Sequence, residues 1–250
     1  MQSGIPRIDW GLVLGTTLLF VMLARTQLYL HYEAALMPSI LIGQNRVALW
    51  LYAALMFPGT LLHEISHASM ATALGIDVQA FDMIPREDAL ASVRIERPDI
   101  VRRFLIGLAP FFTGMCVVVV VGALAFDLTN VYNALAGGNW SEGLRIATKN
   151  LSSVWGWIAL YIVFAVSANM FPSPSDIPPR LQLAFLALPS LFAGLVDLGA
   201  SRLPWLVDLT NTAFQWLLLI FGFTLAIDLP ILLLMTATSE AVAGQFRYRE

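Results

Sequence analysis

The chain has 250 residues, of which 58% are hydrophobic and only 12% charged, and its mean hydropathy is +0.74. An ordinary soluble domain carries about 25% charged residues, so this composition excludes a soluble globular protein and indicates an integral membrane protein. The length of the apolar runs favours helices over the short strands of a barrel. The net charge of −3 argues against nucleic acid as a partner.

Six segments are apolar enough to predict helices within a single domain. They are Trp10–Leu30, Val47–Leu74, Phe104–Phe126, Ser152–Phe171, Leu181–Leu198 and Trp205–Met235. The fifth contains Pro189, Gly194 and Asp197, so it is either a span or a re-entrant or interfacial segment. Asp228 and Pro230 predict a kink or an end within the sixth. The expected fold class is an all-α integral membrane protein with about six transmembrane helices.

The polar stretch between the second and third segments, residues 76–103, has a different pattern. Its runs Val78–Phe81 and Ala91–Ile95 alternate as strands do and are separated by Pro85 and charged neighbours, which predicts a short β-hairpin-like segment. Such a hairpin either pairs with an extended peptide by strand addition or is a plain surface hairpin. After the third segment, Gly137-Gly138-Asn139-Trp140 predicts a flexible loop.

Lysine and arginine are divided unequally between the two sides of the predicted membrane. Nine fall on the side that holds both termini, the 76–103 stretch and the loop after the fourth segment, and five fall on the other side. Because cytoplasmic loops carry the excess of these residues, the first side is predicted to be cytoplasmic. We therefore expect a multi-pass protein with both termini inside.

The second segment contains His63-Glu64-Ile65-Ser66-His67. Residues four apart share one face of a helix, so both imidazoles can bind one zinc ion, and Glu64 can act as general base toward the attacking water. Ionisable groups inside a membrane span are costly and indicate function by default. The alternative is a chance match, with histidines that only hydrogen-bond neighbouring backbone.

A catalytic zinc site needs a third protein ligand, and Asp176 is the best placed candidate. It follows the fourth segment in a proline-broken stretch, Asn169 to Asp176, where the helix must end. The second and fourth segments both run from outside to inside, so Asp176 reaches the same membrane level as His63 and His67. The alternative for Asp176 is a helix cap or turn residue in a loop rich in serine and proline.

The motif His63-Glu64-Ile65-Ser66-His67-Ala68 resembles the zinc-helix signature of the site-2 protease family of intramembrane metalloproteases. Gly107-Leu108-Ala109-Pro110 is similar to that family's Leu-Ala-Gly-Pro-like element, and Asn169-x-x-Pro172 followed by Asp176 is similar to its Asn-x-x-Pro…Asp-Gly element. The chain departs from the pattern because Ala109-Pro110 lacks the intervening glycine and Ile177 stands where the family has glycine after the aspartate.

The resemblance covers the core, about residues 45–180, of a single domain over residues 1–250, and leaves 181–250 as accessory spans and a cytoplasmic tail. It implies a compact member without a PDZ-like insertion. This member would use Zn²⁺ on His63, His67 and Asp176 to hydrolyse a peptide bond in or near a transmembrane segment of a membrane-anchored protein, on the cytoplasmic side of the bilayer.

The resemblance also implies a catalytic role for two further side chains. Glu64 would accept the proton of the attacking water, and Asn169 would donate a hydrogen bond to the substrate or the oxyanion. For Asn169 the alternative is a polar contact between two helices.

Two other functions stay open: a membrane-face metallopeptidase acting on soluble or lipidated peptides, and a proteolytically inactive scaffold of the same fold. His31, in a run with Tyr29 and Tyr32, is assigned to an interfacial aromatic belt and not to a metal site.

Overall fold

The structure is a computed structural model that describes residues 6–43, 46–86, 90–173, 175–177 and 179–247. In chain order its elements are α1 (Trp10–Ile42), α2 (Arg46–Ala73), β1 (Val78–Asp82), β2 (Ser92–Ile95), α3 (Ile100–Phe126), α4 (Leu128–Ala136), α5 (Trp140–Thr148), the 3₁₀ helix η1 (Lys149–Ser152), α6 (Val154–Asn169), α7 (Pro179–Leu198) and α8 (Pro204–Arg247). The expected all-α architecture is confirmed, with one small two-stranded sheet among the described residues.

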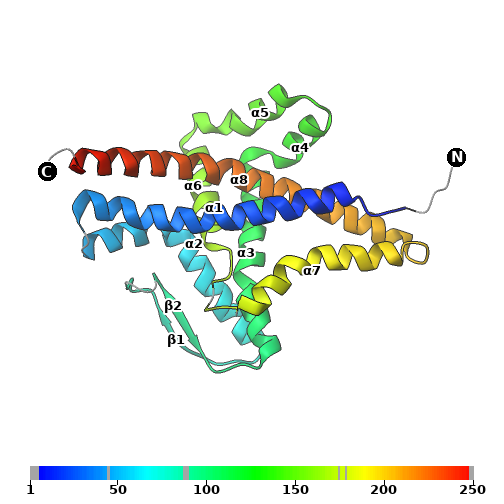
Figure 1. Ribbon diagram of the computed structural model, residues 1–250, viewed down its shortest axis with the longest axis horizontal. Coiled ribbons are helices and arrows are strands. Elements are labelled where there is room, and N and C mark those ends of the chain that lie inside the picture. Colours follow the sequence, from blue (N-terminus) through cyan, green and yellow to red (C-terminus); the bar gives the residue numbers. More distant parts are fainter. Residues whose placement is uncertain (1–5, 44–45, 87–89, 174, 178, 248–250) are drawn as a thin grey trace.

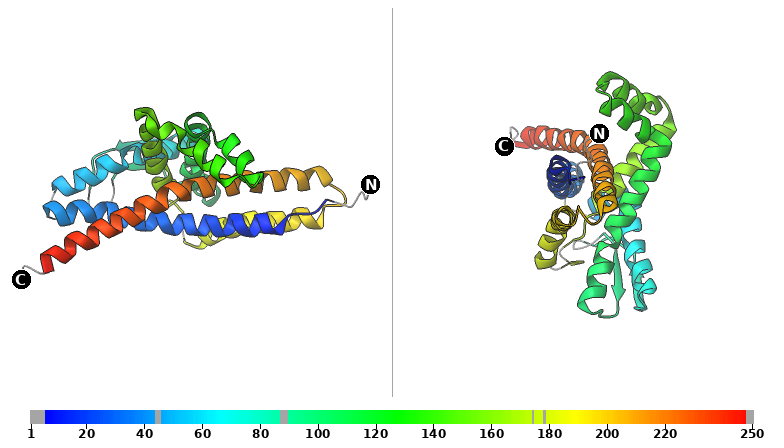
Figure 2. Two further views of the ribbon diagram at one scale, coloured as in Figure 1. Left: turned by 90° about the horizontal axis from the view of Figure 1, so that it is seen from above. Right: turned by 90° about the vertical axis from the view of Figure 1, so that its right-hand side faces the viewer.

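The helices form two groups that cross each other. Helices α3 and α6 stand upright in Figure 1, and α2 slants down beside them to the lower end of α3; we call these three helices the upright group. Helices α1, α7 and α8 run across this group and form the crossing group. Figure 2 agrees, because its right-hand view shows α1 and α7 end-on beside the upright α3. The helices therefore do not form one parallel bundle.

Four of the described helices are long and apolar enough to cross a membrane, namely α1, α2, α3 and most of α8. A fifth candidate is the pair formed by Trp140–Ser152 and α6, which meet at a bend of 108°. Alone, α6 has 16 residues, fewer than the roughly 20 that a bilayer requires. The expected count of about six spans is thus not confirmed: the described residues give four or five candidates, and of α7 only Ala187–Leu198 was identified, as a shorter apolar helix.

Local chemistry sets where several of these helices begin and end. Asp9, Asp99 and Ser153 are N-caps, each accepting hydrogen bonds from backbone amides of the first turn of α1, α3 and α6. Helix α2 ends at Gly75, whose φ of +72° is a conformation that glycine adopts without strain. The chain then enters the sheet, so the cap of α2 determines where the hairpin starts.

The predicted hairpin is present as an antiparallel pair in which Phe81 lies opposite Val93, with an irregularity between Val78 and Ala80. It lies at the bottom end of the upright group, and α4 and α5 lie at the top end (Figure 1). The polar stretch of residues 76–103 and the connection 127–153 therefore occupy opposite ends of the upright group.

Two expectations about secondary structure are narrowed by the structure. The loop predicted around Gly138 is a tight turn in which Gly138 has φ +76°, and it lies between the short helices α4 and α5, which the sequence analysis did not predict. Helix α8 continues through Pro230, so the expected end is wrong there and the kink is the alternative that stays open. A proline removes only one hydrogen-bond donor and clashes with one preceding carbonyl, so the apolar packing on both sides of Pro230 can keep the helix continuous.

An aromatic cluster joins the two groups. The Phe20 ring of α1 lies 5.0 Å from Phe171, 5.8 Å from Phe111 of α3, 5.4 Å from Phe185 of α7 and 5.5 Å from Phe221 of α8, centroid to centroid. These are the separations at which aromatic pairs attract each other. The cluster belongs to the main hydrophobic core and lies directly beyond the end of α6, where the candidate site begins.

Candidate metal centre

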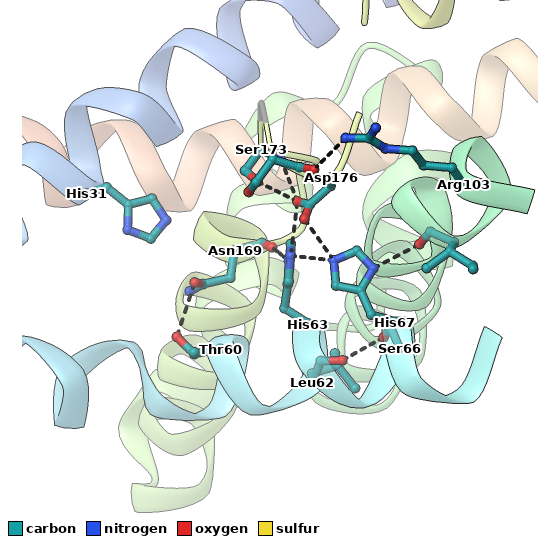
Figure 3. Close-up of polar contacts among 12 residues, drawn as sticks. His31, Thr60, Leu62, His63, Ser66, His67, Arg103, Asn169, Ser173 and Asp176 are labelled. Atoms are coloured by element: carbon teal, nitrogen blue, oxygen red, sulfur yellow. Dashed lines mark hydrogen bonds and ion pairs between the residues drawn. The ribbon is translucent and has the colours of Figure 1, made fainter. Parts of the chain in front are cut away.

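Helix α2 brings His63 and His67 together on one face, as the four-residue spacing predicts. Their ring centroids are 4.6 Å apart and their Nε2 atoms are 3.0 Å apart. Figure 3 shows both rings pointing from α2 toward the chain that follows α6. His67 is buried and His63 is half-buried, so the pair is largely shielded from solvent.

Backbone carbonyls determine which nitrogen of each ring carries the proton. Nδ1 of His63 lies 2.6 Å from the carbonyl oxygen of Asn169, and Nδ1 of His67 lies 2.9 Å from that of Ile106. A carbonyl oxygen can only accept, so each Nδ1 must donate. In the neutral rings both Nε2 atoms then present lone pairs to the same point. Histidines that bind a metal through Nε2 are oriented in this way.

Asp176 faces these two lone pairs. Its Oδ2 atom lies 3.4 Å from Nε2 of His63, and its Oδ1 atom lies 3.3 Å from Nε2 of His67. The carboxylate also accepts hydrogen bonds from the backbone amide and the hydroxyl of Ser173, both at 2.7 Å. Asp176 therefore forms a turn, as its alternative interpretation expected, and the same turn directs its carboxylate at the histidines.

The charge balance at Asp176 suits a cation. Burial raises the pKa of this carboxyl. When both rings are protonated at Nε2, the hydrogen bonds and positive charges of His63 and His67 outweigh burial and hold the pKa well below its usual range, and a cation bound between neutral rings would act in the same direction. Arg103 of α3 donates to the carbonyl oxygen of Ser175 at 3.3 Å and so fastens the loop beside the site. The carboxylate is thus held in its anionic form and in a fixed position.

The three ligand groups fit a zinc ion in both chemistry and spacing. Two imidazole nitrogens and a carboxylate oxygen, all within 4.8 Å of one another, are a donor set that zinc accepts in catalytic sites. Zinc–ligand bonds of about 2.05 Å in a tetrahedron place neighbouring ligand atoms about 3.3 Å apart. The Nε2 atoms lie 3.0 Å apart, and each lies close to that edge from one oxygen of Asp176, at 3.4 Å from Oδ2 for His63 and at 3.3 Å from Oδ1 for His67.

Glu64 lies beside the ligands and points into a cavity. It is half-buried and lines a cavity of about 740 Å³ that also reaches His63 and Asp176. The backbone amide of Val93, in strand β2, is near its carboxylate. The structure therefore brings together all four residues that the sequence assigned to metal binding and proton transfer, namely His63, Glu64, His67 and Asp176.

Asn169 lines the same cavity as Glu64 and contacts two helices. Its Nδ2 donates to the carbonyl oxygen of Ala165 at 2.8 Å, and its Oδ1 accepts from the hydroxyl of Thr60 at 3.2 Å. The side chain thus makes the polar helix–helix contact of the alternative interpretation, and its hydrogen bond to a substrate stays a prediction. Its backbone carbonyl, which the sequence analysis did not single out, orients His63.

Two glycines allow the site to assemble: Gly59, which the sequence analysis did not single out, and Gly107, which it named only as part of the Gly107–Pro110 element. A Cβ added at Gly59 of α2 would overlap the carbonyl oxygen of Ala165 in α6. A Cβ added at Gly107 of α3 would lie 2.9 Å from the carbonyl oxygen of Asp176. The only sequence signal was that both are glycines within apolar helices, where glycine is otherwise unfavourable.

The interpretation of His31 needs correction. His31 is not part of an interfacial aromatic belt, because its ring is half-buried and both nitrogens are bonded inside the protein, to Tyr52 and to the carbonyl of Ala168. Asp228 of α8 is paired with a polar group of another helix. It is fully buried and receives hydrogen bonds from Ser167 of α6 at 2.9 Å.

Comparison with known proteins gives no relative for this chain. No protein-family model, no curated protein and no solved structure matches it. The functional argument therefore depends on the geometry of the site.

Proposed function

We propose that this protein is a zinc-dependent intramembrane endopeptidase that resembles the site-2 protease family. The observation that carries the proposal is the fixed tautomer of both histidines. Carbonyls from α6 and α3 hold Nδ1 of His63 and His67 as donors, so both Nε2 lone pairs converge on the Asp176 carboxylate. Two lone pairs and an anion repel one another unless positive charge lies between them, either protons on the two Nε2 atoms or a metal ion, and the zinc analysis below distinguishes the two.

The residues of the chain would divide the reaction between them. His63, His67 and Asp176 would hold Zn²⁺, which when bound supplies a Lewis acid that polarises the scissile carbonyl and activates water. Glu64 would take the proton of the attacking water and deliver it to the leaving amine. Ser173 and Arg103 would keep the Asp176 loop in place through their hydrogen bonds.

The surroundings of the site support a substrate that lies in a membrane. Four described helices are long and apolar enough to span a bilayer, and the cavity at Glu64 continues along α1 and α2 between side chains such as Phe20 and Leu28. Backbone hydrogen bonds protect a peptide bond within a helix, so the substrate must unwind before attack. We propose that the site faces the cytoplasm, as the lysine and arginine count predicts.

Zinc analysis and cleavage of a reconstituted single-span substrate test this function together. We expect about one zinc per chain in the wild type, none in His67→Ala, and a reduced amount in Asp176→Ala. Asp228→Ala is the matched control, since it removes a buried aspartate that does not face the histidines. Full zinc retention in Asp176→Ala would reject Asp176 as the third ligand.

Glu64→Gln separates chemistry from metal binding. The amide cannot accept a proton, so we expect cleavage to fall at least about 100-fold while zinc content stays unchanged. Activity near that of the wild type would reject the peptidase mechanism. Cleavage of soluble peptides with no cleavage of the membrane-anchored substrate would favour the membrane-face metallopeptidase, and zinc binding without any cleavage would favour the inactive scaffold.

A further inference from the structure

The cavity at the metal centre has a second polar end. Besides Glu64 and the ligands it is lined by Gln27 and His31 of α1 and by Tyr52 of α2. Gln27 and His31 are four residues apart, so they share one face of α1. Figure 3 shows His31 projecting from α1 on the side of Asn169 that faces away from Asp176.

Hydrogen bonds determine what Tyr52 offers to the cavity. Nε2 of His31 lies 2.8 Å from the carbonyl oxygen of Ala168, so Nε2 must donate. In the neutral ring Nδ1 is then the acceptor, and the hydroxyl of Tyr52, 2.7 Å away, donates to it. The Tyr52 oxygen keeps its lone pairs and has no proton left to donate. It therefore presents an acceptor to anything in the cavity.

Gln27 adds an unsatisfied amide. Its side chain is buried with an exposure of 3%, and neither Nε2 nor Oε1 has a hydrogen-bond partner among the described residues. An amide offers donors and an acceptor side by side. Leaving both unpaired in a protein interior is unfavourable, and a group that carries a donor next to an acceptor would satisfy it. In an extended chain the N–H and the C=O of one residue point to the same side and have that arrangement.

The same contacts connect this polar end to the metal centre. The last carbonyls of α6 have no partner within the helix. Two of them, on the consecutive residues Ala168 and Asn169, accept hydrogen bonds from His31 and His63 respectively. One helix end thus positions a metal ligand on one side and the His31–Tyr52 pair on the other. The distance between the two ends of the cavity is fixed by this shared helix end.

We propose that Gln27 and Tyr52, with His31 as a positioning residue, form a subsite that binds a backbone peptide group of the unwound substrate, a few residues from the scissile bond. One substrate N–H would donate to the Tyr52 oxygen, and the Gln27 amide would pair with the N–H and the C=O of another residue of the extended substrate. This inference rests on the proposed peptidase function, because it requires the substrate to lie across the metal centre.

Peptide hydroxamates of stepwise length test the subsite without requiring turnover. The hydroxamate chelates zinc, and tails of one to six leucine residues extend from it along the cavity. In zinc-loaded wild type the dissociation constant should fall with each added residue. We expect one addition to lower it about tenfold more than the other additions do, which is the size of one neutral hydrogen bond, and we call this extra drop the step. Replacing that residue's N–H by an ester oxygen should remove the step.

Two near-isosteric variants assign the step to the subsite. Tyr52→Phe and Gln27→Leu should each reduce it to below about threefold, and Tyr32→Phe, which alters an exposed tyrosine on α1, should retain it. Acetohydroxamate should bind all variants with unchanged affinity, which shows that the metal centre is intact in each. A series with no step, or a step retained in both variants, overturns the subsite alone. Failure of acetohydroxamate to bind the zinc-loaded wild type overturns the peptidase function and the subsite with it.

Discussion

The upright and crossing groups are both apolar, but their backbones approach their neighbours differently. In the upright group α2 touches α6 at Gly59, and α3 touches the Asp176 loop at Gly107, so closely that no Cβ fits. In the crossing group a Cβ at Gly194 or Gly222 would meet no atom closer than 3.7 Å. A metal site needs ligand atoms fixed to within a few tenths of an ångström, and close backbone packing provides that constraint.

The crossing group instead contributes long helices and part of the wall of the cavity. Helices α1 and α8 have 33 and 44 residues, which correspond to about 50 and 66 Å of helix and exceed the roughly 30 Å hydrocarbon core. Their polar bonds, such as Ser239 to Glu33 at 2.8 Å, lie between the two long helices and away from the ligands. In the proposed function the chemistry would therefore depend on the upright group, whereas α1 of the crossing group contributes part of the cavity wall.

Cysteine labelling gives an all-or-none test of how the groups lie in the membrane. Single cysteines at Ser92, Asn139 and Ser201, in a Cys116→Ser background, would be probed in intact cells with an impermeant thiol reagent. Position 139 should be labelled and 92 should not, because they belong to opposite ends of the upright group. Labelling at 201 is expected if the crossing group also spans the membrane. Permeabilised cells are the control, and labelling of 92 and 139 from one side would contradict the arrangement.

The largest stability effect is expected where the two groups meet. Phe111 of α3 is buried with an exposure of 5% in the aromatic cluster, so Phe111→Ala should lower the free energy of unfolding by about 3–5 kcal/mol. Its neighbour Phe112 is 56% exposed, and Phe112→Ala should change it by less than about 1 kcal/mol. Thermal unfolding in detergent would compare them, and equal losses would show that the cluster does not join the groups.

Glycine-to-alanine changes should have opposite signs in the two groups. Gly59→Ala should destabilise the protein by about 1–3 kcal/mol, because the added methyl overlaps Ala165 and forces α2 and α6 apart. Gly222→Ala should be neutral or stabilise α8 by up to about 1 kcal/mol, since alanine is the better helix former and space is available. The same unfolding assay measures both, and a neutral Gly59→Ala would contradict the close packing.

Gly107→Ala should act on zinc affinity with a small effect on folding. The added methyl would press on Asp176 and Ile177 and shift the carboxylate relative to the histidines. Changes that disturb the support of a metal ligand weaken metal binding by about 10–100-fold. Gly194→Ala is the control in the crossing group. Competition with a zinc chelator measures the zinc dissociation constants of both variants. Equal values would show that the position of Asp176 does not affect metal binding.

The helical architecture and the site candidates could be predicted because each follows from a local pattern. Hydropathy marks a long helix directly, and the spacing of His63 and His67 defines one helix face. The alternation in residues 76–103 likewise gave the hairpin, which the structure confirms. The number of spans could not be predicted in this way, since a segment such as α6 is apolar but has only 16 residues and bends sharply away from α5 and η1.

What the sequence determined by itself was the chemistry available: two histidines in helical register, a glutamate between them, and an aspartate after a proline-broken helix. Only the tertiary structure decided how these groups are used. Carbonyls of α6 and α3 select the histidine tautomers, and glycines in α2 and α3 admit the neighbouring backbone. His31, assigned from its neighbours to an interfacial belt, instead shares the end of α6 with His63. Hydrogen-bond partners far apart in sequence decide such roles, and no local pattern encodes them.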